Sequence, residues 1–164
     1  LLGLIIVREI GEMYLAGKTA EEIVEWADAN VLNYAMYLYA DDLKFFAKSG
    51  RISNFSAIMG SLIGLHPIIH LSKDGKMVSL CKCRGKKGSL AKIMEIIEET
   101  HDNICENKVI VGHTGDAATA EYFAEKIKEK FGVKDIEMVV VNPTVGGHCG
   151  PGCVGVALRV KHRS

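Results

Sequence analysis

A glycine-rich stretch at residues 143–155 holds the side chains best suited to chemistry. It contains five glycines and two prolines, and it brings together one imidazole and two thiols, on His148, Cys149 and Cys153. Glycine adopts backbone conformations that side chains obstruct, and it permits close approach by another segment or by a ligand. The stretch is therefore predicted to be a tight loop. Its candidate loop glycines are Gly146, Gly147, Gly150 and Gly152.

Metal binding and thiol chemistry are two possibilities for this stretch. Zinc ligands are often separated by about two to four residues, and Cys149 with Cys153 fits that spacing loosely. The neighbours His148 and Cys149, however, would point apart in an extended loop, so we predict no metal site. A catalytic thiolate needs a nearby base, and the sequence identifies none. A metal-binding or redox enzyme that uses residues 148–153 is therefore the alternative hypothesis, and a crowded turn with an incidental histidine is the simplest one.

Two groups of basic residues are candidates for binding an anion. Arg51 precedes a polar turn, and a guanidinium can donate two parallel hydrogen bonds to one carboxylate. Arg84, Lys86 and Lys87 share a predicted loop with two glycines, where they could dock an acidic partner or meet a phosphoryl group. Ordinary surface exposure is the alternative for both groups. The strand-to-helix turn at 112–116 is a weaker candidate because its own aspartate would repel an anion.

The overall composition is that of a folded domain without a charge bias. Of 164 residues, 48% are hydrophobic, which argues against disorder. The 20 basic side chains balance the 20 acidic ones, which argues against a general nucleic-acid binder. No apolar run is long enough for a membrane span. The five cysteines are odd in number and no secretory context is visible, so reduced thiols and a cytoplasmic location are expected.

The pattern of apolar residues predicts alternating helices and strands. We expect a helix up to residue 17, a second helix opened by a capping box of Thr19 and Glu22, and a loose basic tail at 161–164. The expected strands are 34–40, 66–71, 77–83, 108–112, 136–141 and 154–160. The expected helices among them are 43–47, 55–65, one that begins at Ser89 and one that begins at Asp116. This order, with a hairpin turn at 73–76, predicts an α/β two-layer sandwich with a mixed β-sheet.

Four segments, in the same order and at similar spacing, resemble the DegV family of bacterial fatty-acid-binding proteins. Residues 43–53 (LKFFAKSGRIS) resemble the family pattern L-x-x-L-x-x-G-G-R-I-S, and residues 145–155 (VGGHCGPGCVG) resemble I-G-T-H-T-G-P-G-A-x-G. Residues 60–68 (GSLIGLHPI) resemble G-S-L-L-x-I-K-P-I, and residues 84–87 (RGKK) resemble the basic R-x-R-K-K segment. The agreement extends over nearly the whole chain, which makes it more specific than any single motif.

The resemblance implies a two-domain protein with a fatty acid buried between the domains. Residues 1–33 would be the last helices of an incomplete N-terminal domain, and 34–160 would be the C-terminal lipid-binding domain. Carried over motif by motif, Arg51 and His148 would lie near the carboxylate. The acyl chain would extend into the second domain. The lining residues chosen by pattern are Ile52, Phe55, Ile58, Met59, Leu62 and Ile63.

The resemblance also implies a carrier rather than an enzyme. Family members hold a long-chain fatty acid, such as palmitate, and present its carboxylate to a separate ATP-binding fatty acid kinase subunit, which forms an acyl phosphate. No cofactor, metal, nucleic acid or stable membrane insertion is implied, and the basic residues at 84–87 would dock the kinase. Two departures affect the head group. Gly147 and Cys149 stand where the family has hydroxyl residues, and the first-domain hydroxyl ligands are expected to precede Leu1.

Overall fold

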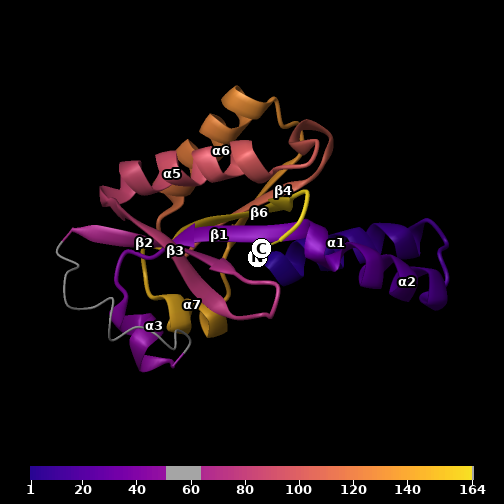
Figure 1. Ribbon diagram of the computed structural model, residues 1–164, viewed down its shortest axis with the longest axis horizontal. Coiled ribbons are helices and arrows are strands. Elements are labelled where there is room, and N and C mark those ends of the chain that lie inside the picture. Colours follow the sequence, from indigo (N-terminus) through magenta and orange to yellow (C-terminus); the bar gives the residue numbers. More distant parts are fainter. Residues whose placement is uncertain (51–63, 164) are drawn as a thin grey trace.

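The computed structural model describes residues 1–50 and 64–163, which form one six-stranded mixed sheet (Figure 1). The strands are β1 (Tyr34–Tyr39), β2 (Leu65–Leu71), β3 (Met77–Arg84), β4 (Val109–His113), β5 (Ile136–Val140) and β6 (Val154–Arg159). Their order across the sheet is β3-β2-β1-β6-β4-β5. The pair β4–β5 is parallel, and the other four neighbouring pairs are antiparallel. The predicted α/β class with a mixed sheet is confirmed.

Helices cover both faces of this sheet, and the two faces carry different sets of helices. The helices are α1 (Leu2–Leu15), α2 (Ala20–Asn30), α3 (Lys44–Lys48), α5 (Gly85–Thr100), α6 (Ala117–Phe131) and α7 (Pro143–Cys149). The long helices α5 and α6 cover one face, and α1, α3 and α7 lie against the other (Figure 1). α2 extends beyond the sheet beside α1 and has no fully buried residue. Among these helices, none combines the length and apolarity needed to cross a bilayer.

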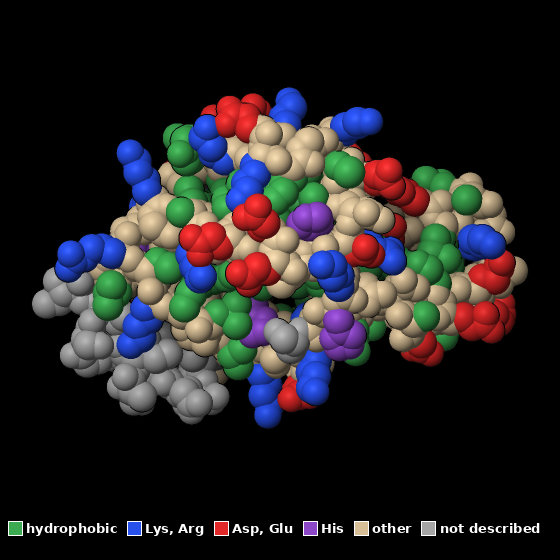
Figure 2. All heavy atoms as spheres, turned by 45° about the horizontal axis from the view of Figure 1, so that its top comes forward, with side chains coloured by type: hydrophobic (Ala, Val, Ile, Leu, Met, Phe, Trp, Pro, Cys, Tyr) green, Lys and Arg blue, Asp and Glu red, His purple; other side chains and the backbone are tan. Residues whose placement is uncertain are grey.

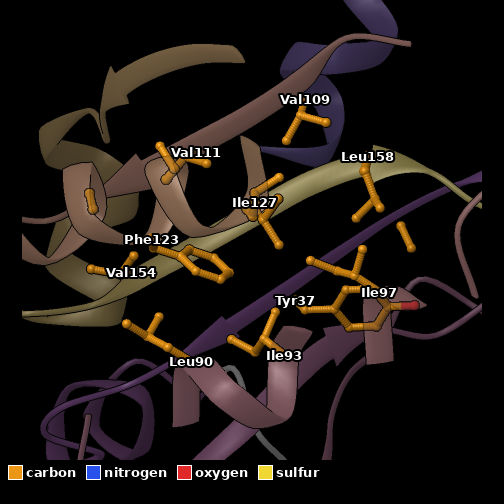
Figure 3. Close-up of a cluster of buried hydrophobic side chains, with 14 of the residues drawn as sticks. Tyr37, Leu90, Ile93, Ile97, Val109, Val111, Phe123, Ile127, Val154 and Leu158 are labelled. Atoms are coloured by element: carbon orange, nitrogen blue, oxygen red, sulfur yellow. The ribbon is translucent and has the colours of Figure 1, made fainter. Parts of the chain in front are cut away.

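Side chains alternate between the two faces of the central strand β1, as expected for a strand buried on both sides. Tyr37 and Tyr39 point toward α5 and α6 and join the main hydrophobic core, part of which is shown in Figure 3. Tyr34 and Leu38 point to the opposite face, toward α1 and α3. Further members of the main core are Leu90, Ile93, Ile97, Val109, Val111, Phe123, Ile127, Val154 and Leu158.

Local sequence signals placed several element ends correctly. The capping box of Thr19 and Glu22 opens α2 with both of its reciprocal hydrogen bonds. Asp116 caps α6 by accepting a hydrogen bond from the Thr119 N–H at 3.2 Å. The hairpin turn between β2 and β3 is present, with Gly75 at a φ of 74°. These ends depend on residues close together in the chain, and for that reason the sequence alone predicts them.

The basic segment 84–88 is not a loop, contrary to prediction. Gly85 has a φ of 66°, which turns the chain from β3 directly into α5. Ser89, predicted to cap this helix, lies inside it and is fully buried, where its hydroxyl donates to the Gly85 carbonyl oxygen at 3.1 Å. Lys86 and Lys87 consequently belong to the first turn of α5.

The glycine-rich stretch is also more regular than predicted. Its first half forms α7, and the tight part, which we call the glycine turn, is confined to residues 150–152. Asn142 caps α7 by accepting a hydrogen bond from the Val145 N–H at 3.0 Å, and Pro143 occupies the first helical position. Asparagine followed by proline is a signal for a helix start as well as for a turn. The glycines that follow it favoured the turn interpretation.

The basic tail is held in place rather than loose. The Lys161 N–H donates to the Thr100 carbonyl oxygen at 3.0 Å, and the Arg163 N–H donates to the Leu32 carbonyl oxygen at 2.7 Å. Arg163 is only 8% exposed. The backbone up to residue 163 therefore joins the end of α5 to the turn that precedes β1.

The first helix packs onto the same sheet as the rest of the chain. Leu2 and Ile5 are buried against side chains of β1, β4 and β6. This packing accounts for the apolar start of the sequence. The assignment of residues 1–33 and 34–160 to two different domains stays a prediction.

Candidate functional site

A cavity of about 220 Å³ lies on the sheet face that carries α1, α3 and α7. Its polar lining consists of Thr114, His148 and the thiols of Cys149 and Cys153. The remaining lining residues are Leu1, Met36, Leu38, Phe46, Met77, Gly112, Val141, Val145, Val154 and Gly155. A concave apolar surface with a few polar groups is the usual composition of a small-molecule site.

Two glycines on neighbouring strands form the floor of this cavity. Gly112 of β4 and Gly155 of β6 are Cα partners in the antiparallel ladder. Leu38 of β1 is the next partner in the same row. Because paired residues point to the same face of a sheet, the sheet lacks two adjacent side chains at this point. The Leu1 side chain enters the space over Gly112, where an added Cβ would lie 2.3 Å from its Cδ2, and it forms part of the cavity wall.

Gly155 also permits a close approach between β6 and β1. A Cβ atom at this position would lie 2.6 Å from the Leu38 Cβ and 2.9 Å from the Tyr37 carbonyl oxygen. Both atoms belong to the backbone or to the first side-chain carbon of a central strand, so neither can move aside alone. A side chain at Gly155 would therefore force the two strands apart.

Replacement of this glycine tests the close approach. Gly155→Ala should lower the free energy of unfolding by about 1–3 kcal/mol, the usual cost of overpacking a core. Gly147→Ala is the matched control, because a Cβ added there meets nothing within 4 Å. Denaturant unfolding of both variants measures the difference. Equal stability of the two variants would show that β1 and β6 separate without cost.

Thr114 fastens the glycine turn to the end of β4. Its hydroxyl donates to the Gly150 carbonyl oxygen at 2.6 Å and accepts a hydrogen bond from the Cys153 N–H at 2.9 Å. Its backbone N–H donates to the Cys153 carbonyl oxygen, and its carbonyl oxygen accepts from the Gly152 N–H at 2.7 Å. The 112–116 segment, considered above as a weak anion site, thus holds the glycine turn in place.

A threonine-to-valine pair tests this anchor. Thr114→Val keeps the side-chain shape but leaves the Gly150 carbonyl and the Cys153 N–H with one hydrogen bond fewer in a buried place. The expected loss of stability is about 1–3 kcal/mol. Thr144→Val, at an exposed position of α7, is the control. A comparable loss in both variants, measured by thermal or denaturant unfolding, would contradict the role of the Thr114 hydroxyl.

His148 lies in the last turn of α7 and borders the cavity. Its Nδ1 atom is buried and has no hydrogen-bond partner among the described residues. A buried polar atom without a partner costs about 1–3 kcal/mol. A ligand that offers a hydrogen-bonding group would remove this cost. The histidine chosen from the sequence therefore lines an apolar cavity with one ring nitrogen available.

Cys149 and Cys153 line the same cavity from the two ends of the glycine turn. The Cys153 thiol donates to the Cys149 carbonyl oxygen at 3.1 Å. The side-chain interaction with Cys153 lowers the pKa of the Cys149 thiol, and the same interaction, together with burial, raises the pKa of Cys153. The extended loop in which His148 and Cys149 would point apart is instead a helix, and both residues line the cavity. Over residues 1–50 and 64–163, no group of three His, Cys, Asp or Glu side chains is arranged to hold a metal ion.

The three basic candidates near the start of α5 have different surroundings. Lys86 donates to Asp116 at 2.7 Å and lies 3.6 Å from a carboxylate oxygen of Asp41. The hydrogen bond to Asp116 is the main reason why the pKa of Lys86 is raised. Arg84 and Lys87 are exposed. Basic and acidic side chains are interspersed on the face formed by α5 and α6 (Figure 2). Arg84 and Lys87 are therefore more available to a partner than Lys86.

Several candidates from the sequence lie outside the described residues. They are Arg51 and the predicted acyl-chain lining, Ile52, Phe55, Ile58, Met59, Leu62 and Ile63. Sequence reasoning missed the lining supplied by Met36, Leu38, Met77 and Val145. A signal for this cavity was present in the glycines that interrupt two apolar strands, since a strand glycine often marks a close approach by a backbone or a ligand.

The chain is thus an α/β domain with a mixed sheet, an apolar cavity on one face and one histidine in the cavity wall. The chain belongs to the DegV family. The family's profile, described as that of an uncharacterised protein family, matches residues 2–161.

Curated relatives agree with this assignment. A DegV domain-containing protein of Clostridium acetobutylicum is 31% identical over 157 residues, which cover 95% of this chain and 55% of that protein. Another, from Clostridium perfringens, is 30% identical over 152 residues, which cover 93% of this chain and 52% of that protein. The chain thus spans about half the length of the curated relatives it matches.

Solved structures share the fold. A fatty-acid-binding DegV family protein from Streptococcus agalactiae matches with a TM-score of 0.83 and 27% identity, over 96% of this chain and 55% of that one. A DegV family protein from Eubacterium eligens loaded with heptadecanoic acid matches with a TM-score of 0.85 and 24% identity, over 96% of this chain and 56% of that one. The Fatty Acid Kinase B3 protein of Streptococcus pneumoniae, loaded with linoleic acid, matches with a TM-score of 0.84 and 17% identity, over 95% of this chain and 55% of that one. These likenesses confirm the fold, and DegV proteins that bind fatty acids are among them.

Proposed function

We propose that this chain binds a long-chain fatty acid, such as palmitate, with part of the acyl chain in the cavity. The observation that carries the proposal is the apolar cavity lined by Gly112 and Gly155, which has His148 in its wall. Membership of a family in which solved relatives hold fatty acids supports the same ligand class.

The affinity of such a site would come from the acyl chain. Each CH₂ group removed from water contributes about 0.8 kcal/mol. The cavity, at about 220 Å³, is smaller than the roughly 300–1,000 Å³ of typical ligand pockets. It would therefore hold one section of the ligand. The six residues between 52 and 63 predicted to line the acyl chain remain candidates for the rest.

The carboxylate would be held near His148 by charge and hydrogen bonds. Arg51 remains the proposed second ligand, and the position of the segment leading to it supports this pairing. Gly50 ends the segment that contains α3, and α3 packs against α7. At that contact, the Phe45 ring lies so close to Gly150 that a Cβ there would be 2.4 Å from a ring carbon. The helix that precedes Arg51 in the sequence therefore lies beside the helix that carries His148.

A cavity-filling variant tests acyl-chain binding. Val145→Trp should weaken palmitate binding at least about tenfold, or about 1.4 kcal/mol, because the indole would occupy the cavity that Val145 lines. Val140→Trp, at a more exposed position of β5 outside the cavity, is the control. Calorimetric titration of the delipidated protein with palmitate measures both. Failure of the unmodified chain to bind palmitate, or unchanged binding by Val145→Trp, would contradict the proposal.

Removal of the imidazole tests the head-group role. His148→Ala should weaken palmitate binding by a factor of about 10 to 100, since a hydrogen bond to a charged group contributes about 1.5–3 kcal/mol. It should leave the binding of hexadecanol nearly unchanged. His162→Ala, in the exposed part of the tail, serves as the control. An equal loss of affinity for the acid and the alcohol would mean that His148 only packs against the chain.

The biochemical role that we propose is that of a non-catalytic carrier. A separate ATP-binding kinase subunit would transfer a phosphoryl group to the presented carboxylate, and this chain would take no part in that transfer. The motif resemblance and the fold shared with the Fatty Acid Kinase B3 protein support this role. Arg84 and Lys87 are the proposed docking residues because they are exposed, whereas Lys86 is engaged by two carboxylates.

Reconstitution tests the carrier role. This chain, loaded with palmitate and given Mg·ATP, should form no acyl phosphate until the ATP-binding subunit from the same organism is added. Arg84→Ala combined with Lys87→Ala should then raise the concentration of carrier needed for half-maximal rate without changing palmitate affinity. Acyl phosphate formed by this chain alone would overturn the carrier role.

A further inference from the structure

Two thiols in the cavity wall are not used by the proposed function. Cys149 ends α7 and Cys153 precedes β6, and the glycine turn between them brings the chain back on itself. The two residues are 6% and 5% exposed, yet both line the cavity. They are therefore shielded from bulk solvent and open to whatever the cavity binds.

The backbone around these thiols is held in one geometry. Gly150 and Gly152 have φ angles of 76° and 79°, a region that favours glycine, so the turn is tight. The hydrogen bonds of Thr114 fix the turn from below, and the Cys153 thiol lies 3.1 Å from the Cys149 carbonyl oxygen. The two cysteines thus form a neighbouring dithiol.

The two thiols differ in acidity. The side-chain interaction with Cys153 lowers the pKa of Cys149, whereas that interaction and burial raise the pKa of Cys153. A thiolate is the reactive form of cysteine. The Cys153 S–H is held by the Cys149 carbonyl oxygen at 3.1 Å. This contact, together with the difference in acidity, assigns Cys149 as the attacking group and Cys153 as the group that reacts second. The other cysteines are placed differently, because Cys81 and Cys83 pack against the core on the opposite face and Cys105 is exposed.

We infer that Cys149 and Cys153 form a reactive dithiol that reduces a hydroperoxide on an acyl chain bound in the cavity. This inference rests on the proposed fatty-acid binding. The sulfur of Cys149 would attack the terminal oxygen of the hydroperoxide, so that an S–O bond forms, the O–O bond breaks and the lipid leaves as an alcohol after taking up a proton. The sulfur of Cys153 would then displace water from the sulfenic acid to form a disulfide. Two thiols lose two electrons, and one hydroperoxide becomes one alcohol and one water.

The cavity would make this reaction selective for lipids. A hydroperoxide that binds through its own acyl chain is held beside the thiols at a high effective concentration. Hydrogen peroxide gains nothing from an apolar cavity and meets thiols that are more than nine-tenths buried. The same pair of cysteines should therefore respond weakly to hydrogen peroxide and strongly to an apolar peroxide.

The tryptic digest of this chain allows a direct test. Residues 135–159 contain no Lys or Arg before Arg159, so one peptide carries Cys149 and Cys153 and no other cysteine. Reduced protein is mixed with linoleic acid hydroperoxide or with hydrogen peroxide at equal concentration, then alkylated and digested. In mass spectrometry, the disulfide is detected as an unalkylated peptide whose mass is lower by two hydrogens. The hydroxy acid is measured by chromatography.

We expect the lipid hydroperoxide to oxidise this peptide at least about tenfold faster than hydrogen peroxide does, with one hydroxy acid formed per disulfide. Excess palmitate should suppress oxidation by the lipid hydroperoxide and leave oxidation by hydrogen peroxide unchanged. Cys149→Ser and Cys153→Ser should each abolish disulfide formation, while Cys105→Ser should not. Dithiothreitol should restore the reduced peptide.

Palmitate titration of the reduced protein separates the two ideas. If the protein binds palmitate but the peptide stays reduced after treatment with the lipid hydroperoxide, the dithiol reaction is overturned and the carrier proposal stands. Absence of palmitate binding would overturn both. Equal rates with the two peroxides, or no competition by palmitate, would show that the cavity does not deliver the substrate and would also overturn the inference.

Discussion

The structure of the site depends on the pairing of two side-chain-free residues in the middle of a packed sheet. Gly112 and Gly155 face each other on β4 and β6, and Leu38 continues their row on β1. Elsewhere on this face, side chains from α1 and α3 fill the surface of the sheet. Close-packed interiors normally leave few voids. Two neighbouring positions contribute no side chain to this layer, and the Leu1 side chain enters the space over one of them and lines the cavity.

The wall above this floor is held by polar contacts with the sheet. Thr114 continues from β4 and bonds to both ends of the glycine turn, while Phe45 of α3 packs against Gly150. The short helix α7 is thereby fixed at its C-terminal end by the turn and at its N-terminal end by the Asn142 cap. His148 and both thiols are carried by this one supported unit. A side chain on such a unit loses little freedom when it meets a ligand.

Much of the architecture could be predicted from the sequence, because strand periodicity and helix caps are local. The failures have local causes as well. The Asn142–Pro143 pair starts a helix, but the following glycines resembled a loop, and the glycine at residue 85 starts a helix without the expected serine cap. The cavity floor was missed for a different reason. The juxtaposition of Gly112 and Gly155 arises from strand order and register, which single-sequence patterns do not specify.

The central place of β6 has a consequence for how the chain reaches its native state. This strand is the last of the six along the sequence, yet it lies between β1 and β4. During synthesis, β1 with β2 and β3 on one side, and β4 with β5 on the other, must wait as separate fragments with unpaired edges. Such long-range pairing is slow and leaves strand edges exposed. The cavity floor, which pairs Gly112 of β4 with Gly155 of β6, is therefore completed only when β6 is inserted between its two neighbours.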